Sequence, residues 1–228
     1  MSQGKRTAGR AAADLVDTGM RVGLGTGSTV FFTLERLAER VQGEGLRMVG
    51  VPTSVDTERK ATAMGIPLTT LDQVDSLDLT IDGADEIDAR LDMVKGGGGA
   101  LLREKVIASI SRREVIVVDA AKVVERLCRK FLLPVEVVPF ARPVVRRALE
   151  QLGGRVVLRL AEPGRAYVTD NGNEIFDVAF PDGIADAARM EARLDAIPGI
   201  VETGLFCGLA HELFIGHDDG RVERRRRA

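Results

Sequence analysis

One stretch of this sequence brings together residue types that could act on an oxyanion. Four consecutive glycines follow Lys95, and Glu104 comes shortly after them. Each glycine in an ordered segment costs roughly 0.5–1 kcal/mol relative to alanine, so four in succession indicate unusual backbone dihedral angles or the close approach of a ligand. Amides at the start of a helix attract anions, and a neighbouring lysine and glutamate supply a positive charge and a proton acceptor. The stretch therefore has the composition of an active site.

Two further carboxylates, Asp82 and Asp85, come at the end of an apolar segment that precedes this stretch. Aspartates often satisfy local backbone amides, so each of them could be only a turn or capping residue. Beside Lys95, however, two carboxylates could exchange protons with the hydroxyls of a substrate, and their mutual repulsion could raise the pKa of one of them. Glu104 alone would be an ordinary exposed helix residue, but its place in the first turns after the glycines is expected to direct it toward a ligand.

The segment 25–29, Gly-Thr-Gly-Ser-Thr, lies between a short apolar segment and a predicted helix. The helix is indicated by Val30, Leu34 and Leu37, which recur at helical spacing. A strand, a Gly/Ser/Thr turn and a helix offer amides and hydroxyls to a phosphate monoester, although a tight turn without a ligand is the alternative. Nucleotide-binding motifs do not fit, because the dinucleotide fingerprint would need a glycine at Ser28 and a P-loop would need a lysine before its Ser or Thr.

Apolar strands alternate with amphipathic helices in the first half of the chain. This alternation predicts parallel βαβ units, in which ligands bind beyond the carboxyl ends of the strands. Four polar segments occupy such positions, namely 25–29, 82–85, the glycine run after Lys95, and 119–122. We therefore expect an α/β fold with a Rossmann-like, mainly parallel sheet flanked by helices, and we expect the four segments to converge at one edge of that sheet.

From about residue 131 onward, the order of the predicted elements changes to strand, helix, strand, strand, helix, strand. This order is that of a small ferredoxin-like α+β domain. The segment 211–215 is then expected to return to the main sheet, so the small domain is an insertion near the C-terminus. The predicted domains are a Rossmann-like catalytic domain, residues 1–129 plus 206–228, and the ferredoxin-like domain, residues 130–205.

The composition excludes several classes of partner. The chain of 228 residues has 32 basic and 34 acidic side chains and a formal net charge of −2, so no overall field attracts nucleic acid or an anionic membrane. The arginines at 224–227 are interpreted as a solvated, frayed end. The two cysteines lack the spacing of metal ligands, and no segment approaches the roughly 20 apolar residues that span a bilayer, so a cytoplasmic protein with free thiols is expected. His211 and His217 are expected to be structural or exposed.

In the same order along nearly the whole chain, these motifs resemble those of the type A ribose-5-phosphate isomerase family. The similar segments are 25–29, 82–86, 95–105, 119–122, 133–139, 168–173 and 197–201. The resemblance implies interconversion of D-ribose 5-phosphate and D-ribulose 5-phosphate in the non-oxidative branch of the pentose phosphate pathway, by a homodimer without a metal or organic cofactor. Lys5 lies where the family often has a lysine near the phosphate, but the local match is poor, and Lys5 is left out of the predicted site.

The resemblance also implies roles for individual residues. Glu104 matches the catalytic base, and Asp82 and Asp85 match residues that hold the hydroxyls of the substrate and assist proton movement. Lys95 and the glycine amides would stabilise the enediolate. The predicted catalytic residues are Glu104, Asp82, Asp85 and Lys95. The predicted substrate-binding residues are Thr26, Gly27, Ser28, Thr29, Asp82, Gly83, Ala84, Asp85, Lys95, Gly96, Gly97, Gly98 and Lys122.

Two alternatives stay open at this point. Related α/β sheets support CoA transferases and sugar-phosphate deaminases, in which a glutamate can be a nucleophile. The chain lacks an obvious additional domain for CoA, and its carboxylates and lysine suit proton transfer among hydroxyls better than acyl transfer. A non-catalytic sugar-phosphate sensor would have the same pocket, but it would usually include a DNA-reading module, and no helix-turn-helix segment is left over.

Overall fold

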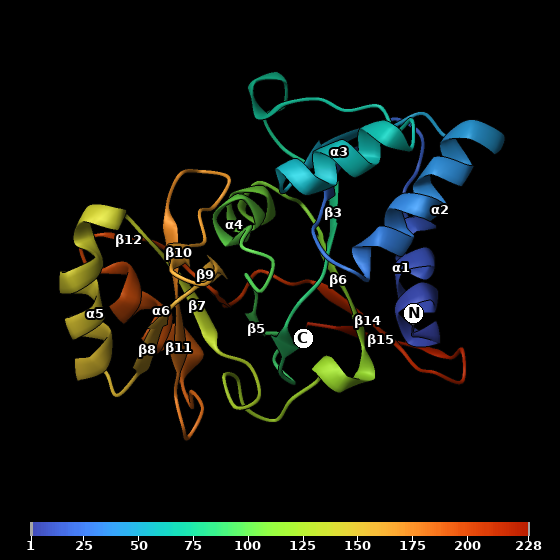
Figure 1. Ribbon diagram of the computed structural model, residues 1–228. Helices are drawn as coiled ribbons and strands as arrows, with labels where there is room; N and C mark the ends of the chain where they lie inside the picture. Colours follow the sequence, from blue (N-terminus) through green and yellow to red (C-terminus); the bar gives the residue numbers. More distant parts are fainter. Residues whose placement is uncertain (1, 228) are drawn as a thin grey trace. The chain divides into compact units, whose positions relative to one another are not determined.

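The computed structural model describes residues 2–227, and their contacts divide the chain into two compact units (Figure 1). Unit 1 contains the chain up to Ala84, then Arg103–Val123 and the segment from Leu209 onward. Unit 2 contains Asp85–Leu102 and Val124–Gly208. The division differs from the expected boundaries, because residues 85–102, 124–129 and 206–208 have their contacts within the smaller unit. None of the helices within residues 2–227 is long and apolar enough to cross a membrane.

Unit 1 is built on a six-stranded sheet with the order β15-β14-β6-β3-β1-β2. Its strands are β1 (Arg21–Leu24), β2 (Val49–Pro52), β3 (Leu79–Asp82), β6 (Glu114–Asp119), β14 (Glu212–Gly216) and β15 (Val222–Arg226). The first five run parallel, and only β15 is antiparallel to its neighbour β14. The expected mainly parallel sheet is thus confirmed, including the return of the segment 211–215 to it.

Helices cover both faces of this sheet. They are α1 (Gln3–Ala13), α2 (Val30–Gly43), α3 (Val55–Ala63) and α4 (Leu101–Ser109), with short 3-10 turns η1 (Leu71–Gln73) and η2 (Ala120–Lys122). Val22 and Leu24 pack in one cluster with apolar residues of α1 and α2, which lie side by side in Figure 1. Gly23 points to the opposite face, where Ile107 of α4 approaches it. Strands buried on both faces explain the near-continuous apolar runs in the sequence.

The arginine-rich end of the chain was wrongly interpreted as frayed. In the structure, it forms β15, which pairs residue by residue with β14 from Glu212↔Arg226 to Gly216↔Val222. The guanidinium of Arg224 lies 5.2 Å from the ring centroid of Phe214, so a charged side chain covers an apolar one at the edge of the sheet. Charged side chains on an edge strand commonly prevent it from pairing with other chains. Because the segment has so few apolar residues, the hydrophobic pattern of the sequence does not indicate this strand.

Unit 2 is built on a four-stranded antiparallel sheet with the order β12-β7-β11-β8. Its chain order is strand, helix, strand, strand, helix, strand, as expected: β7 (Leu133–Val137), α5 (Arg142–Gln151), β8 (Arg155–Leu158), β11 (Glu174–Ala179), α6 (Ala187–Asp195) and β12 (Ile200–Thr203). Val135 and Phe176 pack with Leu149 of α5 and Leu194 of α6, so both helices cover the same face. The 3-10 turn η3 (Pro139–Ala141) precedes α5.

Unit 2 also has two small sheets. Three short strands, β4 (Glu86–Ile87), β5 (Met93–Val94) and β13 (Leu205–Phe206), pair in the order β13-β5-β4. A two-stranded ribbon, β9 (Leu160–Glu162) with β10 (Arg165–Ala166), follows β8. After this ribbon, Val168 makes only an isolated bridge to Glu174.

Candidate active site

Three of the predicted segments follow neighbouring strands of unit 1. The loop 25–29 follows β1, Asp82 ends β3, and the segment 119–122 follows β6, in a sheet where β6, β3 and β1 are adjacent and parallel. The carboxyl ends of parallel strands lie at one edge of a sheet, so the topology alone places these segments together. Direct contacts between them show how they are held.

Asp82 is fully buried at the end of β3, and it is fixed by the backbone of the loop. Its Oδ1 accepts hydrogen bonds from the N–H of Thr26 at 3.0 Å and from the N–H of Gly83 at 2.7 Å. A Cβ at Gly25 would lie 2.2 Å from the same oxygen, so only glycine allows this approach. A buried carboxylate needs such charge-assisted bonds to offset the loss of water.

The hydroxyl of Thr26 belongs to a network inside unit 1. Its Oγ1 lies 2.8 Å from the hydroxyls of Thr53 and Ser54 and 3.1 Å from that of Thr57. Ser54 also caps α3 by accepting from the N–H of Thr57, and Thr57 donates to the carbonyl of Gly25 at 2.8 Å. Thr26 therefore positions the loop with both its N–H and its side chain.

The tip of the loop, Gly27 and Ser28, is exposed just before α2 begins. Lys5 of α1 reaches this tip, since its Nζ donates to Oγ of Ser28 at 3.0 Å and lies 3.8 Å from Oδ2 of Asp119. A helix N-terminus, an exposed hydroxyl and a lysine together attract a phosphate group. Lys5 is thus a candidate that sequence reasoning set aside, because nothing in the local sequence shows that α1 brings it to a loop 23 residues away.

The remaining candidates of unit 1 lie after β6 and on α4. Asp119 accepts from the N–H of Ala121 at 3.0 Å and so caps the turn η2, whose last residue is the half-buried Lys122. Glu104 lies in the first turn of α4, as expected, and its exposed fraction is only 5%. Glutamate is rarely buried to this extent. Unit 1 therefore contains two candidate residues with unusually buried carboxylates, Asp82 and Glu104.

Unit 2 contains the other candidates, beginning with Lys95. This residue directly follows β5, and its exposed fraction is 2%. Its N–H donates to the carbonyl of Gly204 at 2.9 Å, and its Nζ lies 5.5 Å from the ring centroid of Phe206, within the range of a cation–π interaction. A lysine kept out of water in this way retains its attraction for a developing negative charge.

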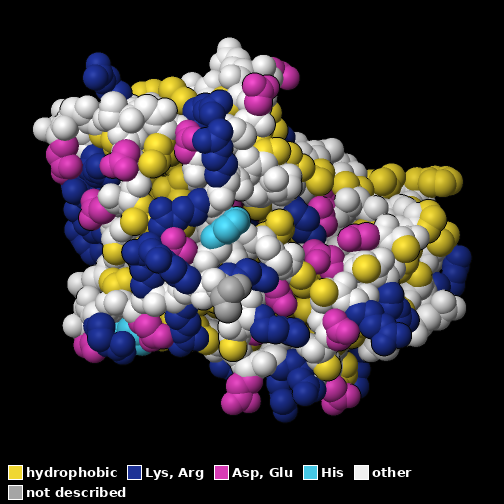
Figure 2. Space-filling model, turned by 180° about the vertical axis from the view of Figure 1, so that it is seen from behind, with side chains coloured by type: hydrophobic (Ala, Val, Ile, Leu, Met, Phe, Trp, Pro, Cys, Tyr) yellow, Lys and Arg dark blue, Asp and Glu magenta, His cyan; other side chains and the backbone are white. Residues whose placement is uncertain are grey.

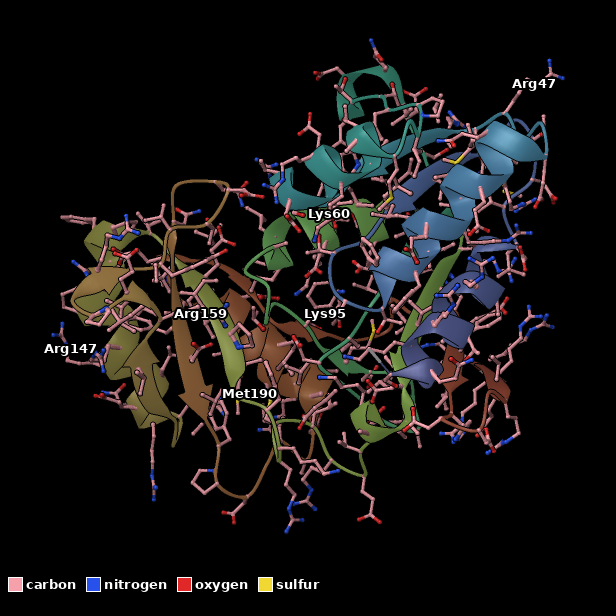
Figure 3. All side chains as sticks on the ribbon, turned by 45° about the vertical axis from the view of Figure 1, so that its right-hand side comes forward. Arg47, Lys60, Lys95, Arg147, Arg159 and Met190 are labelled. Atoms are coloured by element: carbon pink, nitrogen blue, oxygen red, sulfur yellow. The ribbon has the colours of Figure 1, made fainter. Side chains whose placement is uncertain are left out.

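Asp85 and Arg159 hold the glycine loop from two sides. Oδ2 of Asp85 accepts from the N–H of Gly97 at 2.7 Å. Arg159, labelled in Figure 3, donates through Nη1 to the carbonyls of Gly96 at 2.9 Å and Gly97 at 3.2 Å. The same guanidinium makes a two-pronged pair with Asp177, with Nε at 2.9 Å and Nη2 at 2.5 Å from its two oxygens. Such a fork is rigid, so the loop is tied to a fixed point.

Tyr167 completes the support of the glycine loop. Its hydroxyl donates to the carbonyl of Gly98 at 3.2 Å, and burial, followed by the charge of Asp170, raises the pKa of this hydroxyl, which keeps it a donor. Gly99 has φ +80°, and a Cβ there would lie 2.3 Å from the Tyr167 hydroxyl, so two constraints favour glycine. The Gly97 carbonyl and the Gly98 N–H belong to one trans peptide, in which they point in opposite directions. Because Arg159 binds this carbonyl, the N–H of Gly98 points away from Arg159.

Arg159 and Tyr167 were missed by sequence reasoning, which treated their segments only as strands. One signal was available for Tyr167, because it is the single tyrosine of the chain. Among residues 2–227, no group of three or more His, Cys, Asp or Glu side chains is arranged to hold a metal ion.

Taken with the fold, these groups define a class: an α/β protein with an exposed Gly/Ser loop at a helix N-terminus and with buried carboxylate and lysine side chains. Comparison with known proteins narrows this class. The sequence model of the ribose 5-phosphate isomerase A (phosphoriboisomerase A) family matches residues 49–220. The chain belongs to this family, as the resemblance of the motifs predicted.

Individual relatives cover the chain almost completely, including the loop 25–29 that lies outside the matched range. Ribose-5-phosphate isomerase A of Gloeobacter violaceus is 52% identical over 96% of this chain and 94% of its own length. The structure of ribose 5-phosphate isomerase A from Methanocaldococcus jannaschii has a TM-score of 0.92 at 40% identity and covers 97% of both chains. A D-ribose-5-phosphate isomerase in complex with phospho-erythronic acid has a TM-score of 0.94 at 37% identity, over 98% of this chain and 97% of that one.

Proposed function

We propose that this protein interconverts D-ribose 5-phosphate and D-ribulose 5-phosphate by aldose–ketose isomerisation through an enediolate. The observation that carries this proposal is the family match, together with relatives of about half identical sequence over nearly the whole chain. The reaction moves a carbonyl from C1 to C2. It requires a base that removes the C2 proton, a proton delivered to C1, and groups that stabilise the charge on the two oxygens between these steps.

The phosphate of the substrate is assigned to the exposed tip of the loop 25–29. Ser28 and Gly27 offer a hydroxyl and backbone N–H groups at the start of α2, and Lys5 already touches Ser28. Thr26 supports this loop through its hydroxyl network rather than through an exposed group. The same loop would therefore recognise the phosphate and reject a sugar without one, because the cation and the helix N-terminus would lose their ligand.

Glu104 is assigned as the base. A single buried carboxylate can take the proton from C2 and return it to C1 on the same face of the planar enediolate. Asp82 is assigned to the substrate hydroxyls, as the family resemblance implies. The two N–H groups that bind its Oδ1 fix the orientation of the carboxylate for this role. Asp85 and Lys122 are assigned to substrate binding, as the family resemblance implies.

Lys95 and the glycine amides are assigned to the charge that develops on the two oxygens. A well-placed donor of this kind contributes about 3–4 kcal/mol in comparable sites, and Lys95 is almost completely buried, which strengthens its charge interactions. The homodimer that the resemblance implies and the cytoplasmic location that the cysteines and the lack of a long apolar segment indicate stay predictions.

The first prediction tests the base directly. In buffer with excess EDTA, the purified protein should convert ribose 5-phosphate rapidly and unphosphorylated ribose hardly at all. Glu104→Gln keeps the shape of the side chain but removes the proton acceptor, so kcat should fall by about 10²–10⁴-fold while KM stays within a few fold.

Glu58→Gln is the matched control, because Glu58 is an exposed residue in the first turn of α3 and its removal should leave kcat unchanged. Weaker substrate binding with retained turnover in Glu104→Gln would refute the assigned base. No conversion by the folded wild-type protein would instead favour a transferase, a deaminase or a sensor.

A further inference from the structure

A cavity of about 580 Å³ lies in unit 1, away from the loops described above. Its walls come from the residues just before β6, from the start of β14 and from the end of β15, which are the opposite ends of the parallel strands from the candidate loops. The cationic and histidine side chains that line it are Arg112, Arg113, His211, Arg224, Arg226 and Arg227. Cavities of this size hold small molecules. Figure 2 shows Lys and Arg side chains gathered around a histidine on the face seen there.

Positive charge exceeds negative charge in this cavity. Its one acidic lining residue is the buried Glu212, whose two oxygens are shared by Arg113 at 2.5 Å, Arg224 at 2.5 Å and Arg226 at 3.7 Å. Burial acts to raise the pKa of Glu212, but the hydrogen bonds and charges of Arg224 and Arg113 together lower it below its ordinary value. One carboxylate therefore serves three guanidinium groups, in a chain whose overall formal charge is negative.

The other lining groups add further donors. Arg112 shares Asp78 with Arg21, at 3.4 Å and 3.7 Å respectively, and 68% of the Arg112 side chain is exposed. Nδ1 of His211 accepts from the N–H of Glu114 at 3.0 Å, which places the proton of the neutral ring on the other nitrogen. Among residues 2–227, the buried Nε–H of Arg113 finds no acceptor. The side chains that line this cavity thus offer more hydrogen-bond donors than acceptors.

We propose that this cavity binds a small anion that contains a diphosphate group. Guanidinium forks match phosphate oxygens in pairs, and they are arranged here in two banks. Arg112 and Arg113 precede β6, and the other three arginines belong to the C-terminal segment that forms β15. Two banks of arginines suit two linked phosphoryl groups. Inorganic pyrophosphate and a nucleoside diphosphate share this chemistry. The proposal is independent of the isomerase activity.

Isothermal titration of the full-length protein tests the proposal with pyrophosphate, ADP and orthophosphate as probes. Titrations are made with and without saturating ribose 5-phosphate, which is expected to occupy the phosphate loop of the candidate active site. One diphosphate should bind per chain in both conditions, and orthophosphate should bind at least about tenfold more weakly. Tighter binding of ADP than of pyrophosphate would identify a nucleotide as the source of the diphosphate. Affinity should fall with added salt, because exposed charges are screened.

The double variant Arg112→Gln/Arg226→Gln removes one arginine from each bank. Both side chains are 68% exposed, so the fold should persist, and thermal unfolding checks this. Diphosphate affinity should fall by about tenfold or more, since hydrogen bonds to charged groups are lost. Arg225→Gln is the control, because Arg225 pairs with Glu223 outside the cavity. The proposal is overturned if the double variant binds pyrophosphate and ADP as tightly as the wild-type protein does. It is also overturned if ribose 5-phosphate competes with them in both the wild-type protein and the double variant, or if neither binds at millimolar concentration.

Discussion

In unit 1, the loop after β1 is held by groups of the neighbouring strands and of the α3 N-terminus, whereas in unit 2 the glycine loop after β5 is held by side chains from a separate part of the chain. The first loop has many short contacts: Thr26 alone contacts Asp82 through its N–H and three hydroxyls through its side chain. The second has few. Arg159 lies 63 residues from Gly96 and binds two of its carbonyls, and Tyr167 binds a third.

The difference lies in redundancy. A network of four hydroxyls and a buried carboxylate can lose one member and still hold the loop, because each remaining group keeps partners. A loop of four glycines has no side chains of its own to fix it, and its backbone is more flexible than that of any other residue type. Unit 2 therefore depends on side chains outside the loop, those of Asp85, Arg159 and Tyr167, for the geometry that Lys95 and the glycine amides need.

Among the variants that test this contrast between the two loops, the largest effect should come from removing Arg159, the external anchor of unit 2. Arg159→Ala removes both bonds to the glycine carbonyls and leaves the carboxylate of Asp177 without its guanidinium. We expect the free energy of unfolding to fall by about 2–3 kcal/mol and kcat to fall by about 100-fold, since a misplacement of about 1 Å can have that effect. Chemical denaturation and steady-state kinetics measure the two changes.

Two further variants separate stability from positioning. In Arg159→Ala/Asp177→Ala no buried carboxylate is left unpaired, so much of the stability should return while kcat stays low. Arg155→Ala is the control, because Arg155 is an exposed arginine of β8 in the same part of the chain. Recovery of kcat together with stability in the double variant would show that Arg159 only stabilises the fold and does not position the loop.

This contrast also explains which parts of the site could be predicted from sequence. Strand ends and glycine runs are local patterns, and the order of parallel strands follows from alternation, so the positions of the loop 25–29, Asp82 and Lys95 along the fold could be predicted. Their anchors could not, because Arg159 and Lys5 act on residues far away in the sequence. Such pairings depend on tertiary packing, and no local periodicity reports them.

The fold shows the same division between local and long-range information. The six elements of the ferredoxin-like sheet of unit 2 were predicted, since each has its own period and turn residues. β15 was missed because most of its residues are charged: Arg224 binds Glu212 of β14, and Arg225 binds Glu223 of its own strand. The strand forms because β14 supplies a partner for every residue, which is a property of the sheet rather than of the segment.

A smaller effect is expected when unit 1 loses one member of its network. Thr26→Val removes a hydroxyl shared with Thr53, Ser54 and Thr57 but keeps the N–H that holds Asp82. The free energy of unfolding should fall by about 1–2 kcal/mol, and KM for ribose 5-phosphate should rise only a few fold. Thr62→Val, at an exposed threonine of α3, is the control. A loss of kcat as large as that of Arg159→Ala would end the claim that this loop is held redundantly.

The smallest effect should come from the hydroxyl of Tyr167. Tyr167→Phe removes one hydrogen bond of 3.2 Å to the carbonyl of Gly98 and keeps the ring that packs against Gly99. A single neutral hydrogen bond contributes about 0.5–1.5 kcal/mol, so kcat should fall by no more than about tenfold and KM should change little. Tyr167→Ala also removes the ring and should lower kcat further. Equal rates for the two variants would assign the whole effect to the hydroxyl, whereas a wild-type rate in Tyr167→Phe would leave Arg159 as the single side-chain anchor of the glycine carbonyls.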